Sequence, residues 1–279
     1  PGPVLVDIPK DVQIAQCEFT PALRDEAAKA RPVDAQALAK AAELIASAKR
    51  PFLYIGGGVQ IAGAGEELVA LAETIGAPIG SSMMGLSAVP HSHPLFLGMT
   101  GMHGRYAAST ALDRSDLIIA VGTRFSDRAT GNKAEFSKDH KVLHIDIDPA
   151  EISKNIPAYV ALVADVKQAL TALNAMGLPH SDPEWLAEVQ ALMAAPDNHL
   201  TMDPTILNPE LVLKAVNRRL PADSPVATDV GQHQMWVAQY YHFEKPRTFI
   251  TSGGLGTMGF GMGAAMGACI GTGLKKTLL

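Results

Sequence analysis

Two arginines and an aspartate follow a strongly apolar run near the middle of the chain. No polar residue interrupts Leu117–Val121, which is typical of a strand buried on both faces. The run ends at Gly122, and Arg124, Asp127 and Arg128 come next. Ligands of open parallel α/β sheets bind beyond the carboxyl ends of the strands, so these guanidinium groups suit a polyanionic ligand such as a nucleotide. The alternative is a solvated loop with a local Arg–Asp ion pair.

Three consecutive glycines form a second candidate site. Gly56, Gly57 and Gly58 follow the apolar run Phe52–Ile55 and precede an amphipathic stretch at Ala64–Ile75. The order strand, glycines, helix is that of a dinucleotide-binding unit, although the spacing is GGGxxxxGxG and not GxGxxG. Glycines let a backbone approach a ligand closely, but a tight turn explains them equally well.

Histidines mark two further segments of the chain. His91 and His93 have a spacing that a metal could use, but no cluster of cysteines or carboxylates accompanies them. His103 lies in the segment LGMTGMHG, just before an expected helix at Arg105–Leu112. The free N–H groups of a helix N-terminus suit an anion or a polarised ring. Alternatively, His103 is a helix-capping or core histidine.

The elements that position these residues alternate along the chain as in a doubly wound sheet. The expected strands are Phe52–Ile55, Ala77–Ile79, Leu117–Val121, Val142–Asp146 and Val160–Val163. The expected helices are Ala35–Ala48 with Asp34 as N-cap, Ala64–Ile75, Arg105–Leu112, a short one from Asp148-Pro149, and Val166–Ala175 with Asp165 as N-cap. We therefore expect an α/β fold with a doubly wound, Rossmann-like sheet of about five parallel strands.

A second α/β unit is expected after a connector that contains the helix Pro183–Ala194. It contains the strands Val226–Asp229 and Thr248–Thr251 and the helices Pro209–Leu220, Gly231–Tyr241 and Met262–Ile270. This second unit looks incomplete. The glycines of its last helix recur four residues apart, but the segment is too short for a membrane dimer motif.

Bulk composition excludes several classes of function. The 279 residues suggest about two domains, and a net charge of −5 without a basic run makes nucleic acid an unexpected partner. The two cysteines, Cys17 and Cys269, form neither a disulfide framework nor a metal motif, which favours a reducing, cytoplasmic setting. No run approaches the roughly 20 apolar residues of a membrane span. The strand-like start at Val4–Ile8 and the Gly-rich end make us expect a piece of a longer protein.

Seven segments together identify a family. They are GPVLVDIPKDVQ, YIGGGV, LGMTGMHG, GTRFSDRATG, HIDIDPAEI, TDVGQHQMWVAQ and TSGGLGTMGFG. On these segments the chain resembles, over nearly its whole length, the large catalytic subunits of acetohydroxyacid synthase (acetolactate synthase), a family of thiamine-diphosphate enzymes. The loop Arg124–Arg128 and the GQHQMW segment resemble the FAD-containing biosynthetic branch.

The resemblance implies a division into domains. Residues 1–18 would be the last strand of an N-terminal pyrimidine-binding domain, 19–34 a linker, 35–177 the middle FAD-binding domain, 178–208 a connector, and 209–279 the start of a C-terminal diphosphate-binding domain. The catalytic glutamate of the family would lie before the first residue and the Mg²⁺-binding segment beyond the last. The chain would then carry neither catalytic nor metal residues, and we expect it to be inactive alone.

The resemblance also implies residues that contact cofactors. FAD would run along Gly56, Gly57, Gly58, Ser82, Met83, Thr100, Gly101, Met102, His103, Gly122, Arg124, Ser126, Arg128, Asp146, Ile147, Asp165 and Val166. Thiamine diphosphate would contact Gln232, His233, Gly256 and Met258. Met258 would support the bent cofactor, which holds its amino group near the reactive carbon. The chemistry would belong to thiamine diphosphate, and the flavin would have a structural role.

The implied activity is decarboxylation of pyruvate and its condensation with a second 2-oxo acid, pyruvate or 2-oxobutyrate, in branched-chain amino-acid biosynthesis. The implied assembly is a homodimer or tetramer, with a possible regulatory small subunit. Other interpretations are a different thiamine-diphosphate decarboxylase or oxidase, a non-catalytic nucleotide-binding module, or a folded scaffold without a cofactor.

Four departures from the family pattern stand out. Ser126 replaces a second acid, Gly263 replaces a common proline, and Ser82-Met83 replaces Thr-Leu. The tail after Gly271 does not read as the expected next strand, so it is expected to be truncated or foreign sequence.

Overall fold

The computed structural model describes residues 6–19, 32–136, 138–195 and 205–279. The chain divides into two compact units, Pro1–Ala30 and Arg31–Leu279. In the first unit the described residues form one short helix, α1 (Lys10–Ile14). The expected strand Val4–Ile8 begins outside the described residues, and its remainder, 6–8, has no strand structure. Most of the expected linker, residues 20–31, also lies outside them.

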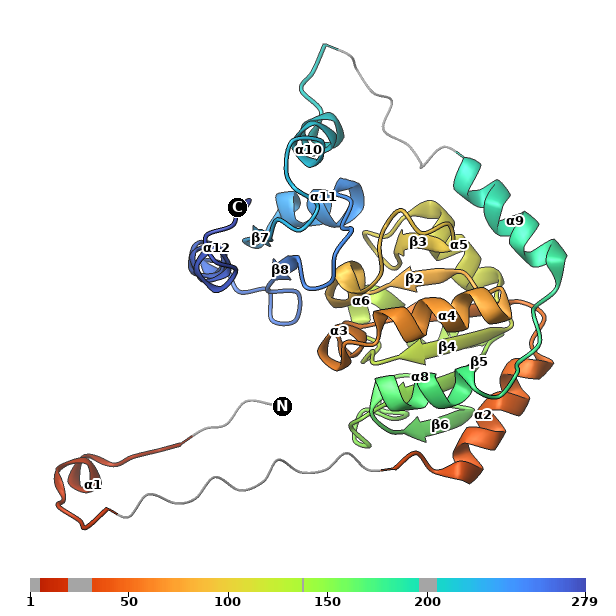
Figure 1. The fold of residues 1–279 in the computed structure, drawn as a ribbon, viewed down its shortest axis with the longest axis horizontal. Coiled ribbons are helices and arrows are strands. Elements are labelled where there is room, and N and C mark those ends of the chain that lie inside the picture. The colour runs from red at the N-terminus through yellow and green to blue at the C-terminus, as the bar shows by residue number, and fades with distance from the viewer. Residues whose placement is uncertain (1–5, 20–31, 137, 196–204) are drawn as a thin grey trace. The chain divides into compact units, whose positions relative to one another are not determined.

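A parallel sheet of six strands forms the centre of the second unit (Figure 1). Its order is β3-β2-β1-β4-β5-β6, and every neighbouring pair is parallel. The strand order reverses between β1 and β4, which lie side by side in the middle of the sheet. The strands are β1 (Pro51–Ile55), β2 (Ile79–Ser81), β3 (Phe96–Met99), β4 (Leu117–Val121), β5 (Lys141–Asp146) and β6 (Val160–Val163). The doubly wound fold is thus confirmed, with one strand more than expected.

Two strand predictions need correction. The strand expected at Ala77–Ile79 begins at Ile79 and runs to Ser81, so only its last residue was right. Strand β3 was not predicted, because Gly98 interrupts its short apolar run with a left-handed φ of +95°. The missing side chain of Gly98 leaves space that the Arg105 side chain fills: a Cβ there would lie 2.8 Å from Arg105 Cγ.

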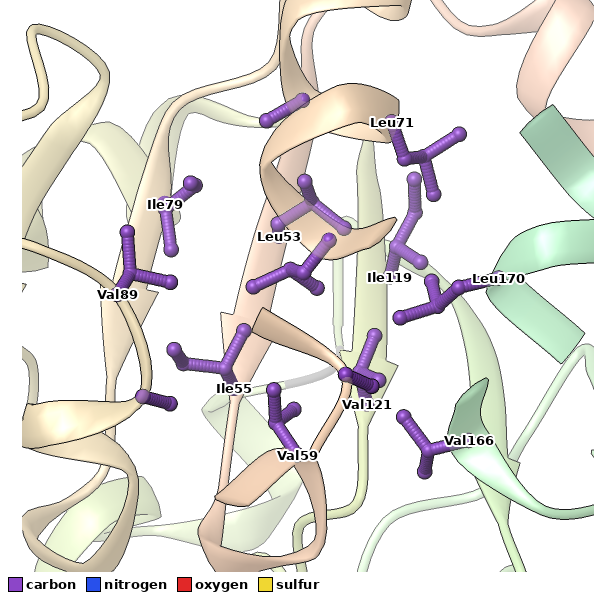
Figure 2. Close-up of a cluster of buried hydrophobic side chains, with 14 of the residues drawn as sticks. Leu53, Ile55, Val59, Leu71, Ile79, Val89, Ile119, Val121, Val166 and Leu170 are labelled. Carbon is purple, nitrogen blue, oxygen red and sulfur yellow. The ribbon is translucent and has the colours of Figure 1, made fainter. Parts of the chain in front are cut away.

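Helices cover both faces of the sheet because its buried strands present apolar side chains to both sides. Leu53 and Ile55 of β1 belong to one core, while Phe52 and Tyr54 belong to the other. Figure 2 shows the first core, where Leu71 from α4 and Leu170 from α8 approach strand residues. That core takes residues from α2 (Ala35–Ser47), α3 (Gly57–Ala62), α4 (Gly65–Ile75) and α8 (Val166–Asn174), and the second core takes them from α5 (Tyr106–Arg114) and α9 (Pro183–Ala194).

Capping residues set the starts of the helices, as the sequence predicts. The Asp34 carboxylate accepts a hydrogen bond from the Ala37 N–H at 2.6 Å, and Asp165 accepts one from the Gln168 N–H at 3.0 Å. The helix expected from Pro149 is wrong, because residues 149–154 form turns. Ser153 there has a φ of +57°, which a helix does not accommodate. Short helical segments not predicted from the sequence are α1, α3, η1 (Met83–Ala88), α6 (Asp127–Thr130) and α7 (Lys133–Phe136). Of these, α3 begins within the three-glycine run.

The remainder of the second unit is built on a pair of parallel strands, β7 (Val226–Thr228) and β8 (Phe249–Thr251). Three helices accompany them: α10 (Pro209–Asn217), α11 (Gln232–Tyr240) and α12 (Phe260–Gly271). The tail also joins this pair, since Leu278 forms a parallel bridge with Val226. The Leu278 carbonyl accepts a hydrogen bond from the Ala227 N–H at 2.8 Å. This isolated bridge is the strand-like pairing found in the described tail, which forms no strand of its own.

Contacts join the six-stranded sheet to this second strand pair. The His91 N–H donates to the Phe243 carbonyl at 2.8 Å, and the His91 ring packs edge-on against the Phe243 ring. Burial lowers the pKa of His91 to about 4, so this histidine is neutral at pH 7. The Arg247 guanidinium donates to the carbonyl groups of Gln60 and Ile61 at the end of α3. None of the helices in the described ranges has the length and apolarity needed to cross a bilayer.

Candidate cofactor site

The carboxyl ends of β1 and β4 meet where the strand order reverses. The Gly56 N–H donates to the Val121 carbonyl and the Gly58 N–H to the Gly122 carbonyl, both at 3.0 Å. A Cβ at Gly56 would overlap the Gly122 carbonyl oxygen, and one at Gly58 would lie 2.6 Å from the Gly122 Cα. These glycines therefore let the first turn of α3 lie directly against the loop after β4. In doubly wound sheets, ligands bind in the crevice beside such a reversal.

The loop after β4 displays its arginines because Phe125 is anchored in the core. Phe125 is 1% exposed, and its ring packs edge-on against the rings of Phe136 and His144 at 5.8 and 5.2 Å. Its φ is +51°, a conformation that is uncommon for a bulky residue. Arg124 and Arg128 on either side are exposed, and neither guanidinium pairs with a carboxylate in the part of the chain that the structure describes. The local Arg–Asp ion pair is therefore not formed there.

Neutral polar groups lie beside the loop that carries Arg124 and Arg128. His144 Nε2 lies 2.9 Å from the Thr123 carbonyl oxygen, so the tautomer that carries its proton on Nε2 donates to it. Burial lowers the pKa of His144 and keeps the ring neutral. Burial also raises the pKa of Tyr54 to about 12, so its hydroxyl group is neutral. The Asn155 amide donates to the Arg124 carbonyl at 2.9 Å, which fixes the start of the loop.

The segment Thr100–His103 lies against the arginine loop. The Met102 N–H donates to the Arg128 carbonyl at 3.0 Å, and a Cβ at Gly101 would lie 2.7 Å from the Arg128 oxygen. Thr100 is buried, whereas the Met102 side chain is 63% exposed. Arg105, not His103, is the N-cap of α5, so the capping interpretation of His103 is wrong. His103 is half-buried and is not a core residue.

Other expected FAD contacts differ in what they offer a ligand. Asp146 ends β5 and accepts the Asp148 N–H at 2.9 Å, and burial raises the pKa of its carboxyl group. Ile147 beside it is exposed, and Asp165 already caps α8. Val166 is 3% exposed in the core of Figure 2, so its side chain is not available to a ligand.

Ser82 and Met83 follow β2, the neighbour of β1. The Ser82 N–H donates to the Ile55 carbonyl at 2.9 Å, which places Ser82 beside the start of the glycine loop. Gly57 faces the neighbouring Met84, since a Cβ at this glycine would lie 3.2 Å from the Met84 Cβ. Met83 packs partly against the first core, so it offers only the rest of its side chain to a ligand.

The residues expected to contact thiamine diphosphate lie around α11 and the start of α12. Gln232 and His233 are exposed in the first turn of α11, and the Met258 side chain is 79% exposed. Gly256 has a φ of +63°, which favours glycine. The loop that carries Gly256 and Met258 is held at its end by the Asp229 carboxylate.

Sequence reasoning missed the role of Asp229. Its carboxylate accepts the N–H groups of Gly259 and Gly261, each at 2.9 Å, and the Val230 N–H at 2.8 Å. These backbone donors, that of Gly261 first, lower the pKa of Asp229. The carboxylate thus ties the end of β7 to the start of α12. An acid at a strand end is the only sequence signal, because its partners lie about thirty residues further along.

The rings of His91 and His93 each face a protein oxygen atom. His91 Nε2 lies 2.8 Å from the Leu86 carbonyl oxygen, and His93 Nε2 lies 3.3 Å from a Glu73 carboxylate oxygen. No group of three or more histidine, cysteine, aspartate or glutamate residues in the described ranges could hold a metal ion.

The chain belongs to the thiamine pyrophosphate enzyme family. Residues 38–173 match the thiamine pyrophosphate enzyme central domain, and residues 229–278 match the C-terminal TPP binding domain of such enzymes. The second match includes the tail, so the expectation of foreign sequence after Gly271 is wrong.

Within this family, the chain is similar to acetolactate synthases. It is 45% identical to the acetolactate synthase large subunit of Corynebacterium glutamicum, over 96% of this chain and 44% of that protein. It is 46% identical to the acetolactate synthase of Mycobacterium bovis, over 97% of this chain and 45% of that protein. It is 43% identical to a probable acetolactate synthase large subunit of Methanocaldococcus jannaschii, over 96% of this chain and 48% of that protein. The chain thus spans a little under half the length of these relatives.

Proposed function

We propose that the protein containing this chain is an acetolactate synthase large subunit. It decarboxylates pyruvate and condenses the product with a second 2-oxo acid, giving 2-acetolactate or 2-aceto-2-hydroxybutyrate for branched-chain amino-acid biosynthesis. The observation that carries the proposal is an identity of 45–46% to proteins of that name, sustained over at least 96% of the chain. The proposed substrates are pyruvate and 2-oxobutyrate.

We further propose that the reversal point between β1 and β4 binds FAD, which makes the protein a flavoprotein. The residues present suit a dinucleotide with two phosphates, because the exposed guanidinium groups of Arg124 and Arg128 have no carboxylate partner in the described structure. The glycine loop, Ser126 and the segment Thr100–His103 lie at or beside the same edge. Asp146 ends a later strand, as an acid that binds a ribose hydroxyl pair would. In this site the flavin has a structural role.

Thiamine diphosphate is proposed to bind around α11 and the loop before α12. Gln232 and His233 would face its phosphates, while Gly256 and Met258 would contact its aminopyrimidine. The exposure of Gln232, His233 and Met258 leaves these side chains accessible to such a ligand. When bound, the cofactor supplies the stabilised carbanion chemistry on which decarboxylation depends. Met258 would supply an apolar support, and Asp229 would hold the backbone of the loop in place.

Three further features belong to the proposal for the whole protein. Mg²⁺ would be held by residues other than those described here. The assembly would be a homodimer or tetramer, with a regulatory small subunit as a further partner. The protein would act in the cytoplasm.

The flavin site can be tested by titrating the purified chain with FAD and following flavin fluorescence. We expect saturable binding that Arg124→Ala weakens by about tenfold or more, because a charge-assisted hydrogen bond contributes about 1.5–3 kcal/mol. Arg50→Ala is the matched control, since Arg50 is exposed and precedes β1 at the opposite edge of the sheet. Equal binding by wild type and Arg124→Ala would contradict the assignment of the arginine loop.

The activity needs a separate experiment. The full-length polypeptide encoded by the gene would be supplied with pyruvate, thiamine diphosphate, Mg²⁺ and FAD, and the acetolactate formed would be measured. Product formation is expected. Saturable FAD binding without any product would favour the second interpretation, a non-catalytic nucleotide-binding module.

A further inference from the structure

Helix α11 is bonded to the proposed flavin segment by a reciprocal pair of hydrogen bonds. The Gln239 side-chain Nε2 donates to the His103 carbonyl at 2.8 Å. In the opposite direction, Arg105 Nη1 donates to the Gln239 backbone carbonyl at 2.9 Å. Both bonds are partly buried, and both involve a single residue of α11.

The Arg105 side of this pair is held in place by its surroundings. The Arg105 N–H donates to the Met99 carbonyl at 2.7 Å, at the end of β3. The Arg105 side chain lies over Gly98, where any Cβ would collide with it. The pKa values of the nearby His91 and His242 are lowered mainly by burial. The positive charge of Arg105 is a smaller cause in the same direction. These histidines are therefore neutral near pH 7 and do not repel the guanidinium.

The other end of α11 is fixed to the strands β7 and β8. The Gln234 amide donates to the Thr251 hydroxyl at 2.6 Å, and the Thr251 hydroxyl lies 2.7 Å from that of Thr228. Residues Gln232 and His233, proposed to contact thiamine diphosphate, are in this same first turn. One short helix thus connects the two proposed cofactor regions.

We propose that Gln239 is a positioning residue for the flavin-binding segment Thr100–His103, an inference that rests on the proposed FAD site. Its amide fixes the His103 carbonyl, and the segment then keeps the orientation in which the Met102 N–H bonds to the Arg128 carbonyl. A residue outside the six-stranded sheet therefore sets the geometry of a ligand segment that follows one of its strands. Through α11, the same bond links FAD binding to the residues proposed for thiamine diphosphate.

The test is the FAD affinity of Gln239→Leu, measured by flavin fluorescence. Leucine has a similar size but cannot donate to His103. We expect the dissociation constant for FAD to rise about three- to tenfold, which corresponds to the loss of one net hydrogen bond. Asn217→Leu is the matched control, because Asn217 also donates an amide hydrogen bond to a carbonyl, that of His242 at 3.1 Å, from the neighbouring helix α10. The control should bind FAD as the wild type does.

Amide hydrogen exchange of residues 100–105 separates positioning from general stability. Gln239→Leu should accelerate exchange in this segment severalfold without ligand, while exchange in β4 stays at the wild-type rate. Unchanged exchange in the segment would overturn the proposal, and so would an equal loss of FAD affinity in Asn217→Leu. If the wild type bound no FAD at all, the flavin site would be wrong, and the proposal that Gln239 positions a flavin-binding segment would fail with it. The exchange rates would then still show whether Gln239 holds the segment, so the two failures are distinguishable.

Discussion

The six-stranded sheet and the β7–β8 pair differ in how their apolar surface is covered. Every residue of β1 and β4 is buried, and helices within the same compact unit complete both cores. Helix α12, by contrast, buries only Gly261, while Met262, Met266 and Ile270 are each about 60–70% exposed. The difference teaches that the strands of the first region are covered by helices on both faces, whereas the second region presents an apolar helix that the described residues do not cover.

The contact between the glycine loop and β4 gives the largest expected effect. Gly56→Ala forces a Cβ into the Gly122 carbonyl and to 2.7 Å from the Thr123 Cα, and backbone cannot yield as a flexible side chain can. We expect the free energy of unfolding to fall by about 3 kcal/mol or more. Urea unfolding followed by circular dichroism measures it. A loss under about 1 kcal/mol would show that the backbone around Gly56 can yield to a Cβ.

A pair of truncations tests burial directly. Leu170 on α8 is fully buried, so Leu170→Ala should cost about 3 kcal/mol of unfolding free energy. Met266 on α12 is 59% exposed, and Met266→Ala should change it by less than about 0.5 kcal/mol. Chemical denaturation of both variants provides the measurement. Similar losses in the two variants would mean that α12 is covered in solution.

The junction of the two regions should respond to pH through His91. Its folded pKa is about 4, against about 6.5 in an unfolded chain. Between these values the unfolded chain binds a proton that the folded protein does not, so stability is complete above pH 6.5 and falls as the pH is lowered toward 4. From pH 7 to pH 5 we expect this histidine to remove about 2 kcal/mol.

The measurement compares unfolding at the two pH values for the wild type and His91→Phe. Because His91→Phe has no titrating group at this position, its unfolding free energy should fall by about 2 kcal/mol less than that of the wild type between pH 7 and pH 5. Equal losses would show that His91 is accessible to protons in the folded state.

A small effect of opposite sign is expected in α12. Nothing lies within 4 Å of a Cβ built on Gly267, and this glycine is inside the helix. Gly267→Ala should therefore stabilise α12 by about 0.5–1 kcal/mol through its helix propensity. Slower amide exchange of α12 would confirm it. If Gly267→Ala destabilised the protein instead, another surface would have to pack against the glycine face of α12. Helix α12 would then be covered, as the six-stranded sheet is.

The fold was predictable where local pattern decides it and not where distant contacts do. Leu117–Val121 was predicted with its observed ends, because five apolar residues between Asp116 and Gly122 leave little choice of boundary. Strand β3 was missed because Gly98 breaks a four-residue run, and the pairing of Leu278 with Val226 joins residues that no local pattern connects. The misplaced helix at Pro149 shows the same limit, since the left-handed Ser153 is not visible in the sequence.

The candidate site shows a similar division. The order of residue types along the chain predicted charged side chains just after the strands, and the exposure of Arg124 after β4 agrees with that prediction. The burial of the Val166 side chain, the backbone partners of Asp229 and the bond from Gln239 to His103 depend on tertiary packing. The cofactor contacts themselves stay predictions until ligands are measured.

The parallel pairing of β1 with β4 also has a consequence for the newly made chain. Leu53 is the register partner of Ile119, and Gly58 completes its hydrogen bond only with Gly122. While the ribosome has not yet released the chain past the loop of Arg124 and Arg128, the first strand has no central neighbour and the glycine loop has no surface to close against. Because such non-local pairing forms slowly, the emerging β1 exposes a fully apolar strand during translation. The flavin site proposed at the reversal point would therefore be completed only late in synthesis.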